Sequence, residues 1–451
     1  GRSSFRSVSR PYPARRGGAA IIRQRIRGHG QPMTLHGTHA ASTATRRDLL
    51  AYLGGAGLWL AGANLQQFLV TWLLVGILAE PGARVGAAQL AIAVPGFLLM
   101  LLGGGAGDRT DARTMLLRIH ALAILPPLTL AFVLRGAELS YGLVIAFGVA
   151  VSALAGFSEP GRAALLSRVA IGDIQRAVVL STVVSALCGL AGTWLGGRID
   201  VLGLAVVLVL QAALFGAGGV AVAGVDPART ARPTPAPGPQ EGRLAALADG
   251  FRVLWRTRLV RDLVGLNFVS SVCNAGAWFV VYPFLITRLY AGDAGLLAGL
   301  SIVFFGGSVL SNLVLLRVLP TARPGRLYLL MQLTRVVLVG TLALQPPTWL
   351  LVVATLGWGM NMGVTNTMAR ALVQANAPEA HRARVLSVFI LGTMAAAPLG
   401  AVLLGTLVDL AGVRAGFVPA LVASGVILGL GVTVTPLWRH QDPAAQRSPS
   451  T

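Results

Sequence analysis

The chain has 451 residues, of which 55% are hydrophobic and only 12% charged, and its mean hydropathy is +0.71. Soluble domains carry about 25% charged residues, so the composition excludes an ordinary soluble enzyme and is typical of a membrane protein. A net charge of +21 would suggest nucleic-acid binding in a soluble protein, but here the arginines fall mostly in short segments between apolar runs, so we predict no nucleic-acid partner.

Residues 1–47 are rich in Arg, Gly and Ser, and we predict a disordered basic tail. Six apolar runs follow, each long enough to cross most of a hydrocarbon layer of about 30 Å as a helix. They predict an N-terminal six-helix bundle over residues 48–225. The six runs are 49–78, 85–102, 116–134, 139–157, 177–195 and 201–225.

A linker over residues 226–261 separates two similar halves. Its first part, 226–240, holds five prolines, which exclude helix and membrane there. Over 241–258, apolar and charged residues alternate at helical spacing, which predicts an amphipathic helix on the inner membrane surface. A C-terminal six-helix bundle over 262–438 and a polar tail over 439–451 complete the chain. The six C-terminal runs are 263–289, 295–316, 327–344, 349–367, 385–407 and 416–437.

Arginine is unevenly distributed among the predicted loops. With both termini inside, each cytoplasmic loop carries several arginines. Cytoplasmic loops are generally enriched in basic residues, so the asymmetry favours an even number of spans and two cytoplasmic termini. The outer loops hold only Arg84, Arg135, Arg198, Arg288 and Arg414.

A glycine run closed by charged residues, 103–113, lies between the second and third predicted spans. Asp108 is placed to cap a helix N-terminus and to meet its positive dipole. The stretch resembles the loop after the second helix in the major facilitator superfamily, with Gly104, Asp108, Arg109 and Arg113 at matching positions. The resemblance implies that these four residues form a conformational motif that stabilises one of two alternating states.

Two further stretches, 157–166 and 378–387, resemble the branch of this superfamily that contains enterobactin exporters and drug-efflux proteins. Together the resemblance covers about residues 48–438. Thr193 stands where the antiporter motif of the fifth helix carries a proline. The resemblance implies an all-α membrane protein, with twelve transmembrane helices in two pseudo-symmetric six-helix bundles.

Uncharged polar side chains recur at helical spacing in the first, fourth, seventh and tenth predicted spans. Each spacing places its members on one face of a helix, and amides that faced lipid would lack hydrogen-bond partners. In the resembled fold these four helices line the central cavity, although amides also join helices to one another in membranes. The predicted cavity residues are Asn64, Gln67, Thr71, Ser152, Asn267, Ser271, Asn274, Asn361 and Thr365.

Two charged residues lie within or at the inner end of predicted spans. Glu159, at the inner end of the fourth span, is the predicted proton-coupling acid, because the other acids fall in loops or at span ends. The alternative is that Glu159 only pairs with Arg162. Arg335 lies near the middle of the ninth span, where it either has a function or packs and snorkels toward the inner surface.

These observations predict a secondary active transporter that exports a small hydrophobic, siderophore- or drug-like molecule by alternating access, with protons as the proposed counter-ion. The alternatives are a nutrient uptake transporter and a non-transporting membrane receptor or assembly partner. No HExxH, GxSxG or P-loop pattern supports an enzyme or an ATP-driven pump. We expect a monomer in a bacterial plasma membrane, in contact with lipid, and no cofactor or metal.

Overall fold

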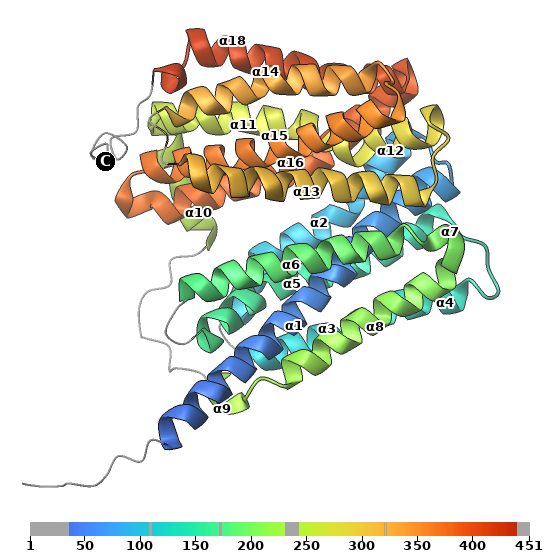
Figure 1. Ribbon diagram of the computed structural model, residues 1–451, viewed down its shortest axis with the longest axis vertical. Coiled ribbons are helices and arrows are strands. Elements are labelled where there is room, and N and C mark those ends of the chain that lie inside the picture. The colour runs from blue at the N-terminus through green and yellow to red at the C-terminus, as the bar shows by residue number, and fades with distance from the viewer. Residues whose placement is uncertain are drawn as a thin grey trace, which may run out of the picture. The chain divides into compact units, whose positions relative to one another are not determined.

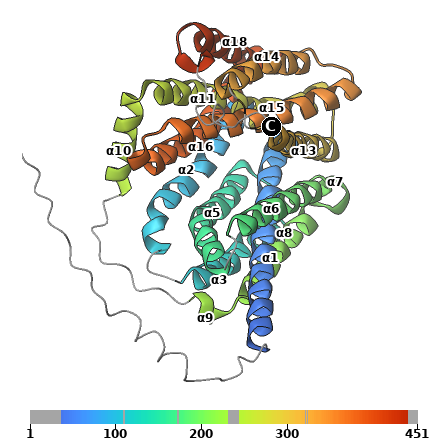
Figure 2. The same cartoon turned by 60° about the vertical axis from the view of Figure 1, so that its left-hand side comes forward.

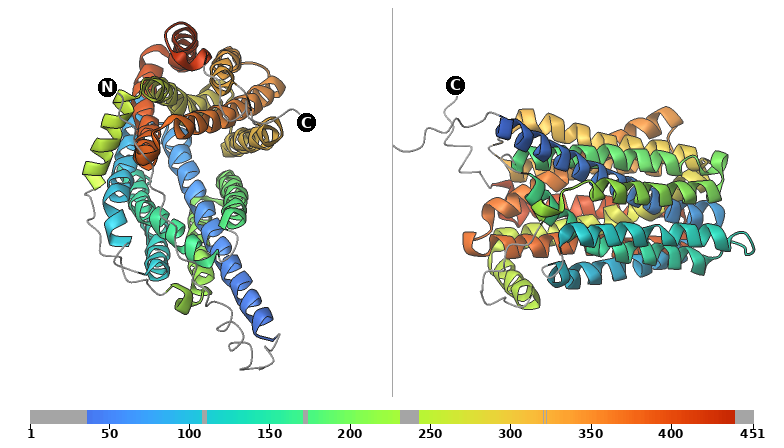
Figure 3. Two further views of the ribbon diagram at one scale, coloured as in Figure 1. Left: turned by 90° about the vertical axis from the view of Figure 1, so that its left-hand side faces the viewer. Right: turned by 90° about the horizontal axis from the view of Figure 1, so that it is seen from below.

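The computed structural model describes residues 36–107, 111–170, 174–230, 243–319, 321 and 323–439. Within these ranges, helices are the only regular secondary structure. From Thr45 onward the described residues form one compact unit, whose long helices run side by side (Figure 1 and Figure 3). The predicted all-α class is confirmed.

The two ends of the helical unit differ in the short helices that they carry. The linker end carries α9 (Pro227–Thr230) and α10 (Arg243–Arg256), and the far end carries α7 (Ile199–Leu202) and α12 (Tyr282–Phe284) (Figure 1).

The first half follows the predicted runs with two differences. The first helix starts at His36, inside the predicted tail, and the third run forms two helices because Pro126 and Pro127 cannot donate backbone hydrogen bonds. The other bounds are α1 (His36–Trp72), η1 (Leu73–Ile77), α2 (Gly82–Gly107), α3 (Ala112–Ala123), α4 (Leu125–Val133), α5 (Tyr141–Val169), α6 (Ile174–Gly196) and α8 (Leu204–Ala223).

The linker contains two helices. The expectation of no helix over 226–240 is wrong at its start, because Asp226 accepts a hydrogen bond from the Ala228 amide (2.9 Å) and opens the single turn α9. The predicted amphipathic helix is α10, which lies beside α16 (Arg382–Ala411) (Figure 2). Asp249 of α10 pairs with Arg384, whose guanidinium, together with His381, lowers the pKa of the Asp249 carboxyl.

The second half repeats the order of the first. Its first helix ends at the far end in π-helical turns, as α1 does in η1, and π-helical turns are frequent at functional sites. The remaining bounds are α11 (Arg258–Gly276), η2 (Ala277–Val281), η3 (Leu285–Leu289), α13 (Ala294–Val318), α14 (Pro324–Ala343), α15 (Thr348–Asn376), η4 (Glu379–His381), α17 (Val413–Gly416), α18 (Val418–Thr433) and η5 (Pro436–Trp438).

Eleven stretches of helix in the described ranges are long and apolar enough to cross a membrane. They correspond to eleven of the twelve predicted runs. The tenth run forms the 29-residue helix α15 but is not among them, because polar side chains such as Asn361, Thr365 and Asn366 lower its hydropathy. The halves meet where α2 packs on α16 and α6 packs on α13.

Candidate functional site

A cavity of about 150 Å³ lies between the two halves. The first half supplies side chains from α1 and α6, and the second half supplies side chains from η2, α12 and α13. Among the described residues that line the cavity, none is Asp, Glu, Arg or His. The lining residues are Asn64, Gln67, Phe68, Thr71, Thr193, Trp278, Phe279, Tyr282, Pro283, Leu297, Ser301 and Phe305.

The wall formed by α1 is polar. Asn64, Gln67 and Thr71, three of the predicted cavity residues, line the cavity together, as their helical spacing requires. The Asn64 amide donates to the Leu60 carbonyl (2.9 Å), and the Thr71 hydroxyl donates to the Gln67 carbonyl (3.0 Å). Gln67 is exposed, so its amide is available to a molecule in the cavity.

Gln89 of α2 extends this polar wall. Its side-chain nitrogen lies 3.4 Å from the Thr71 hydroxyl, and its side-chain oxygen lies 3.5 Å from the Gln67 nitrogen. Helical spacing did not predict Gln89 as a cavity residue, because it is the only amide in its apolar run. A lone glutamine in a membrane-length apolar run was the available signal.

The opposite wall is aromatic. Trp278 stacks on Phe304 with ring centroids 3.6 Å apart, and on Tyr282 with centroids 5.0 Å apart. Trp358 meets the Trp278 ring edge-on at 5.5 Å, and Phe305 meets it at 5.8 Å. The rings therefore pack both face to face and edge to face, the two arrangements that aromatic pairs prefer. These rings were not predicted from the sequence, because aromatic residues in apolar runs are ordinarily core residues.

The other predicted cavity residues do not line this cavity. The Ser152 hydroxyl lies against Gly96 of α2, where an added Cβ would lie 2.4 Å from it. Asn267 lies 3.5 Å from the Ser271 hydroxyl, and Asn274 donates to the Ser270 carbonyl (2.8 Å). Their assignment to a substrate path stays a prediction.

Asn361 and Thr365 contact Arg335, which lies within the second half and is only 4% exposed. The guanidinium donates to the Asn361 side-chain oxygen (3.0 Å) and to the Thr365 hydroxyl (3.1 Å), and therefore joins α14 to α15. It also donates to the Ser270 hydroxyl of α11 (2.6 Å) and to Gln332 (3.1 Å). Arg335 is therefore packed in the bundle rather than extended toward the linker end.

Part of the predicted conformational motif lies outside the described residues. Asp108 and Arg109 are not described, and Gly104 belongs to α2 by its backbone. Arg113 donates to the backbone carbonyls of Val225 and Ala223, at 2.8 Å each, and so holds the end of α8 within the first half. The role of the four residues in a change of state stays a prediction.

Glu159 lies at the linker end of α5. Its side chain is 62% exposed and forms an ion pair with Arg162, whose side chain is 13% exposed. Arg162 Nη1 is buried without a hydrogen-bond partner, so part of this guanidinium has unused donor capacity. This geometry agrees with the alternative that Glu159 only pairs with Arg162. It does not test whether Glu159 couples transport to protons.

Two aspartates join the halves at the far end. Asp409, near the end of α16, accepts hydrogen bonds from the backbone amides of Gly82 and Ala83 at the start of α2, both at 2.7 Å. Asp200 of α7 accepts one from the Ala294 amide at the start of α13 (3.0 Å). Each half therefore supplies a carboxylate to a helix N-terminus of the other half, where the helix dipole favours negative charge.

Close backbone packing accompanies these hydrogen bonds. A Cβ added to Gly82 would lie 2.4 Å from the Gly405 carbonyl oxygen, and one added to Gly405 would lie 2.1 Å from the Gly82 carbonyl oxygen. Only glycine permits α2 and α16 to approach this closely. The far end is therefore closed by helix contact as well as by the two carboxylates.

The sequence resembles known export proteins. A family model described as transmembrane secretion effector matches residues 55–449. Over 248 residues the chain is 27% identical to the multidrug efflux pump Tap of Mycobacterium tuberculosis, covering 54% of each protein. Over 177 residues it is 29% identical to the enterobactin exporter EntS of Shigella boydii, covering 38% of this chain and 41% of that protein. These alignments span about half the length of the relatives, or less.

Solved structures share the fold. The nucleoside transporter NupG superposes with a TM-score of 0.68 over 87% of this chain and 99% of its own, at 15% identity. A POT family transporter superposes with a TM-score of 0.65 over 86% of this chain and 96% of its own, at 12% identity. At such low identity these likenesses establish a common architecture and nothing about the substrate.

Proposed function

Because the chain belongs to the transmembrane secretion effector family of the major facilitator superfamily, we propose that it exports a small, uncharged or weakly charged aromatic molecule by alternating access. The observation that carries the proposal is the central cavity, where the amides of α1 face the rings of η2 and α13. A flat aromatic solute can stack on Phe305 and meet the edge of Trp278, whose plane crosses that of Phe305 at 81°, while Asn64 and Gln67 bond its polar edge.

The relatives support export over uptake. Tap is named for multidrug efflux and EntS for enterobactin export. This chain aligns with only part of the length of each protein. We place the protein as a monomer in a bacterial inner membrane, with the linker end in the cytoplasm, because the arginines concentrate in the loops at that end. In this orientation the far end faces outward, and the described structure is closed to the outside.

Transport of an uncharged aromatic dye tests this proposal. We expect inside-out vesicles that contain the protein to accumulate Nile red, and vesicles without it to accumulate little. Accumulation in right-side-out vesicles instead would indicate uptake, and binding of the dye without flux would indicate a receptor.

Substitutions in the cavity should change the apparent affinity for the transported dye. Gln67→Ala and Phe305→Leu should each raise its apparent KM by about threefold to tenfold, because each removes one contact worth about 1 kcal/mol. Asn312→Ala is the matched control, since Asn312 bonds Ser308 and Thr367 outside the cavity. An equal change in the Asn312 variant would contradict the assignment of the site.

We also propose that Glu159 couples transport to protons, because its exposed carboxylate lies at the end that would face the cytoplasm. Glu159→Gln should abolish dye accumulation driven by a pH gradient and leave exchange of the dye across the membrane unchanged. Glu138→Gln, at an exposed acid beyond the spans, should change neither. Normal pH-driven accumulation in the Glu159 variant would leave that residue only its pairing with Arg162.

A further inference from the structure

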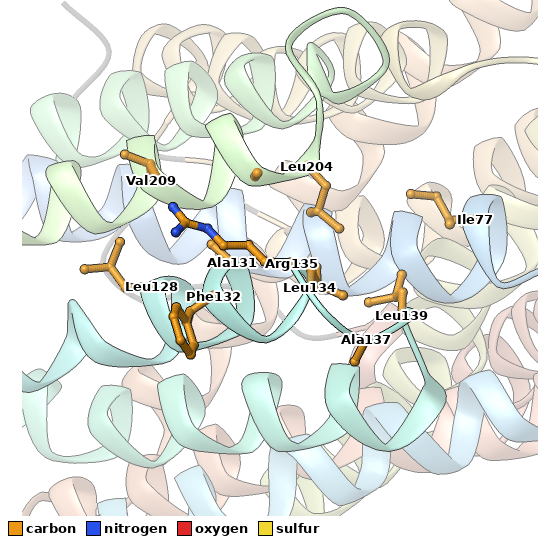
Figure 4. A pocket seen from close by; sticks show the side chains of 11 residues that line it. Ile77, Leu128, Ala131, Phe132, Leu134, Arg135, Ala137, Leu139, Leu204 and Val209 are labelled. Atoms are coloured by element: carbon orange, nitrogen blue, oxygen red, sulfur yellow. The ribbon is translucent and has the colours of Figure 1, made fainter.

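A second hollow lies on the side of the first half, between α4 and α8 at the far end, and has a volume of about 790 Å³ (Figure 4). It shares no lining residue with the central cavity. Phe132 on one side is 70% exposed and Val209 on the other is 50% exposed, so the hollow opens laterally. Apart from Arg135, the described residues that line it are apolar. We call this hollow the lateral groove.

Arg135 differs from the other far-end arginines. Its backbone amide donates to the Phe132 carbonyl (3.1 Å), but its side chain makes no hydrogen bond, ion pair or ring contact with any residue that the structure describes. Its side chain lies along the groove, with the guanidinium near Val209 and Ala131 (Figure 4). The other four each have a partner: Arg84 has Glu80 and Tyr141, Arg198 has Trp194, Arg288 has Phe284, and Arg414 has Gln345.

The groove lies where two of the membrane-length spans end. The span that contains α4 ends at Val133, and the span of α8 begins at Leu204, so Arg135 lies just beyond both span ends. An unpaired guanidinium beside apolar surface is costly in this zone unless an anion or water binds it. A guanidinium presents a planar fork of donors that matches a phosphate group.

We propose that the lateral groove binds one anionic phospholipid of the surrounding bilayer. Its phosphate bonds the Arg135 guanidinium, and an acyl chain lies along Leu128, Phe132 and Val209. The lateral opening gives a membrane lipid direct access, and the groove's apolar lining matches a hydrocarbon chain. Such a lipid joins α4 to α8 across the face of the first half.

Native mass spectrometry of the purified, delipidated protein tests the proposal. Titration with dioleoylphosphatidylglycerol should give one adduct that binds more tightly than dioleoylphosphatidylcholine. Arg135→Gln should weaken phosphatidylglycerol binding about tenfold and remove this preference, because charge-assisted hydrogen bonds to the phosphate are lost. Arg414→Gln, at a far-end arginine that has its own protein partner, should bind phosphatidylglycerol like the wild type.

A second variant tests the acyl chain separately. Val209→Trp adds bulk at a half-exposed position in the groove, and it should weaken binding of both lipids. Glycerol 3-phosphate, which has no acyl chains, should not compete with the lipid at equal concentration. The proposal is overturned if the two lipids bind equally to the wild type, if Arg135→Gln binds phosphatidylglycerol normally, or if glycerol 3-phosphate competes.

Discussion

Replacing Asp200 and Asp409 together with alanine should open the far end and raise the reactivity of a cysteine placed in the central cavity. The two carboxylates bind helix N-termini of the opposite half, at 3.0 Å for Asp200 and 2.7 Å for Asp409. In the alternating-access cycle that we propose, these contacts exist only while the far end is closed. Their loss therefore acts on the balance between closed and open states more than on the fold of either half.

The expected size of this shift follows from helix capping. A cap contributes about 0.5–2 kcal/mol, and both aspartates are exposed, so about 1 kcal/mol each is appropriate. Loss of about 2 kcal/mol in total shifts the closed-to-open ratio roughly thirtyfold. Asparagine retains a capping oxygen, so the double asparagine variant should shift the ratio less than the double alanine variant.

Thiol labelling of intact cells measures the shift. Ser301→Cys, at a residue that lines the cavity, is placed in a chain whose Cys188 and Cys273 are alanine. A membrane-impermeant maleimide should label this cysteine slowly in the parent and much faster in the double alanine variant. Fast labelling in the parent would contradict a closed far end, or the proposed orientation.

Asp293→Ala is the matched control for the far-end variants. Asp293 caps the same helix, α13, from within its own half, by accepting a hydrogen bond from the Leu296 amide (2.8 Å). Its loss frays the helix without removing a contact between halves. If Asp293→Ala raised labelling as much as the double variant, general fraying would explain the effect.

The sequence predicted the helices well because each needs only a long apolar run. Their interruptions were less visible: the division of the third run follows from two prolines, but the π-helical turns of η1 and η2 have no comparable signal. Resemblance to the superfamily then supplied the arrangement of the two bundles, which composition and periodicity do not specify.

The site was predicted only in part. Helical spacing identified the polar face of α1, and the structure places Asn64, Gln67 and Thr71 in one cavity. The same spacing identified Asn361 and Thr365, but spacing cannot say which neighbouring helix covers a face. In this chain Arg335 of α14 covers the face of α15 that carries Asn361 and Thr365.

The contacts between halves were invisible for a related reason. Asp409 lies 327 residues from Gly82 in the sequence, and Asp200 lies 94 residues from Ala294. Both aspartates bond backbone amides, which carry no sequence signal of their own. These hydrogen bonds form only when α2 packs against α16 and α6 packs against α13, an arrangement that the sequence does not reveal.

Arg335→Ala should destabilise the second half more than substitution of an exposed arginine such as Arg317. The guanidinium joins α14 to Asn361 of α15 and to Ser270 of α11, and the Asn361 amide in turn donates to the Met331 carbonyl (2.6 Å) and the Thr334 hydroxyl (2.8 Å). Truncation leaves a cavity and several buried acceptors without a donor. Such losses cost about 3–5 kcal/mol where a buried charged network is broken.

Thermal unfolding of the purified protein measures this loss. At about 2 °C for each kcal/mol, Arg335→Ala should lower Tm by about 6–10 °C. Arg335→Lys keeps the charge but can reach fewer of the acceptors, so its Tm should fall between those of the wild type and the alanine variant. Arg317→Ala, at an exposed arginine of α13, should leave Tm unchanged.

The same variants separate a structural role for Arg335 from a role in transport. If packing is its only role, transport per folded molecule should remain near the wild-type rate in Arg335→Lys, because the lysine preserves the charge and part of the network. A lysine variant with wild-type Tm and no transport would show instead that the guanidinium itself takes part in the transport cycle. An alanine variant with wild-type Tm would show that the four hydrogen bonds of Arg335 do not stabilise the second half, since their loss would then have no thermal consequence.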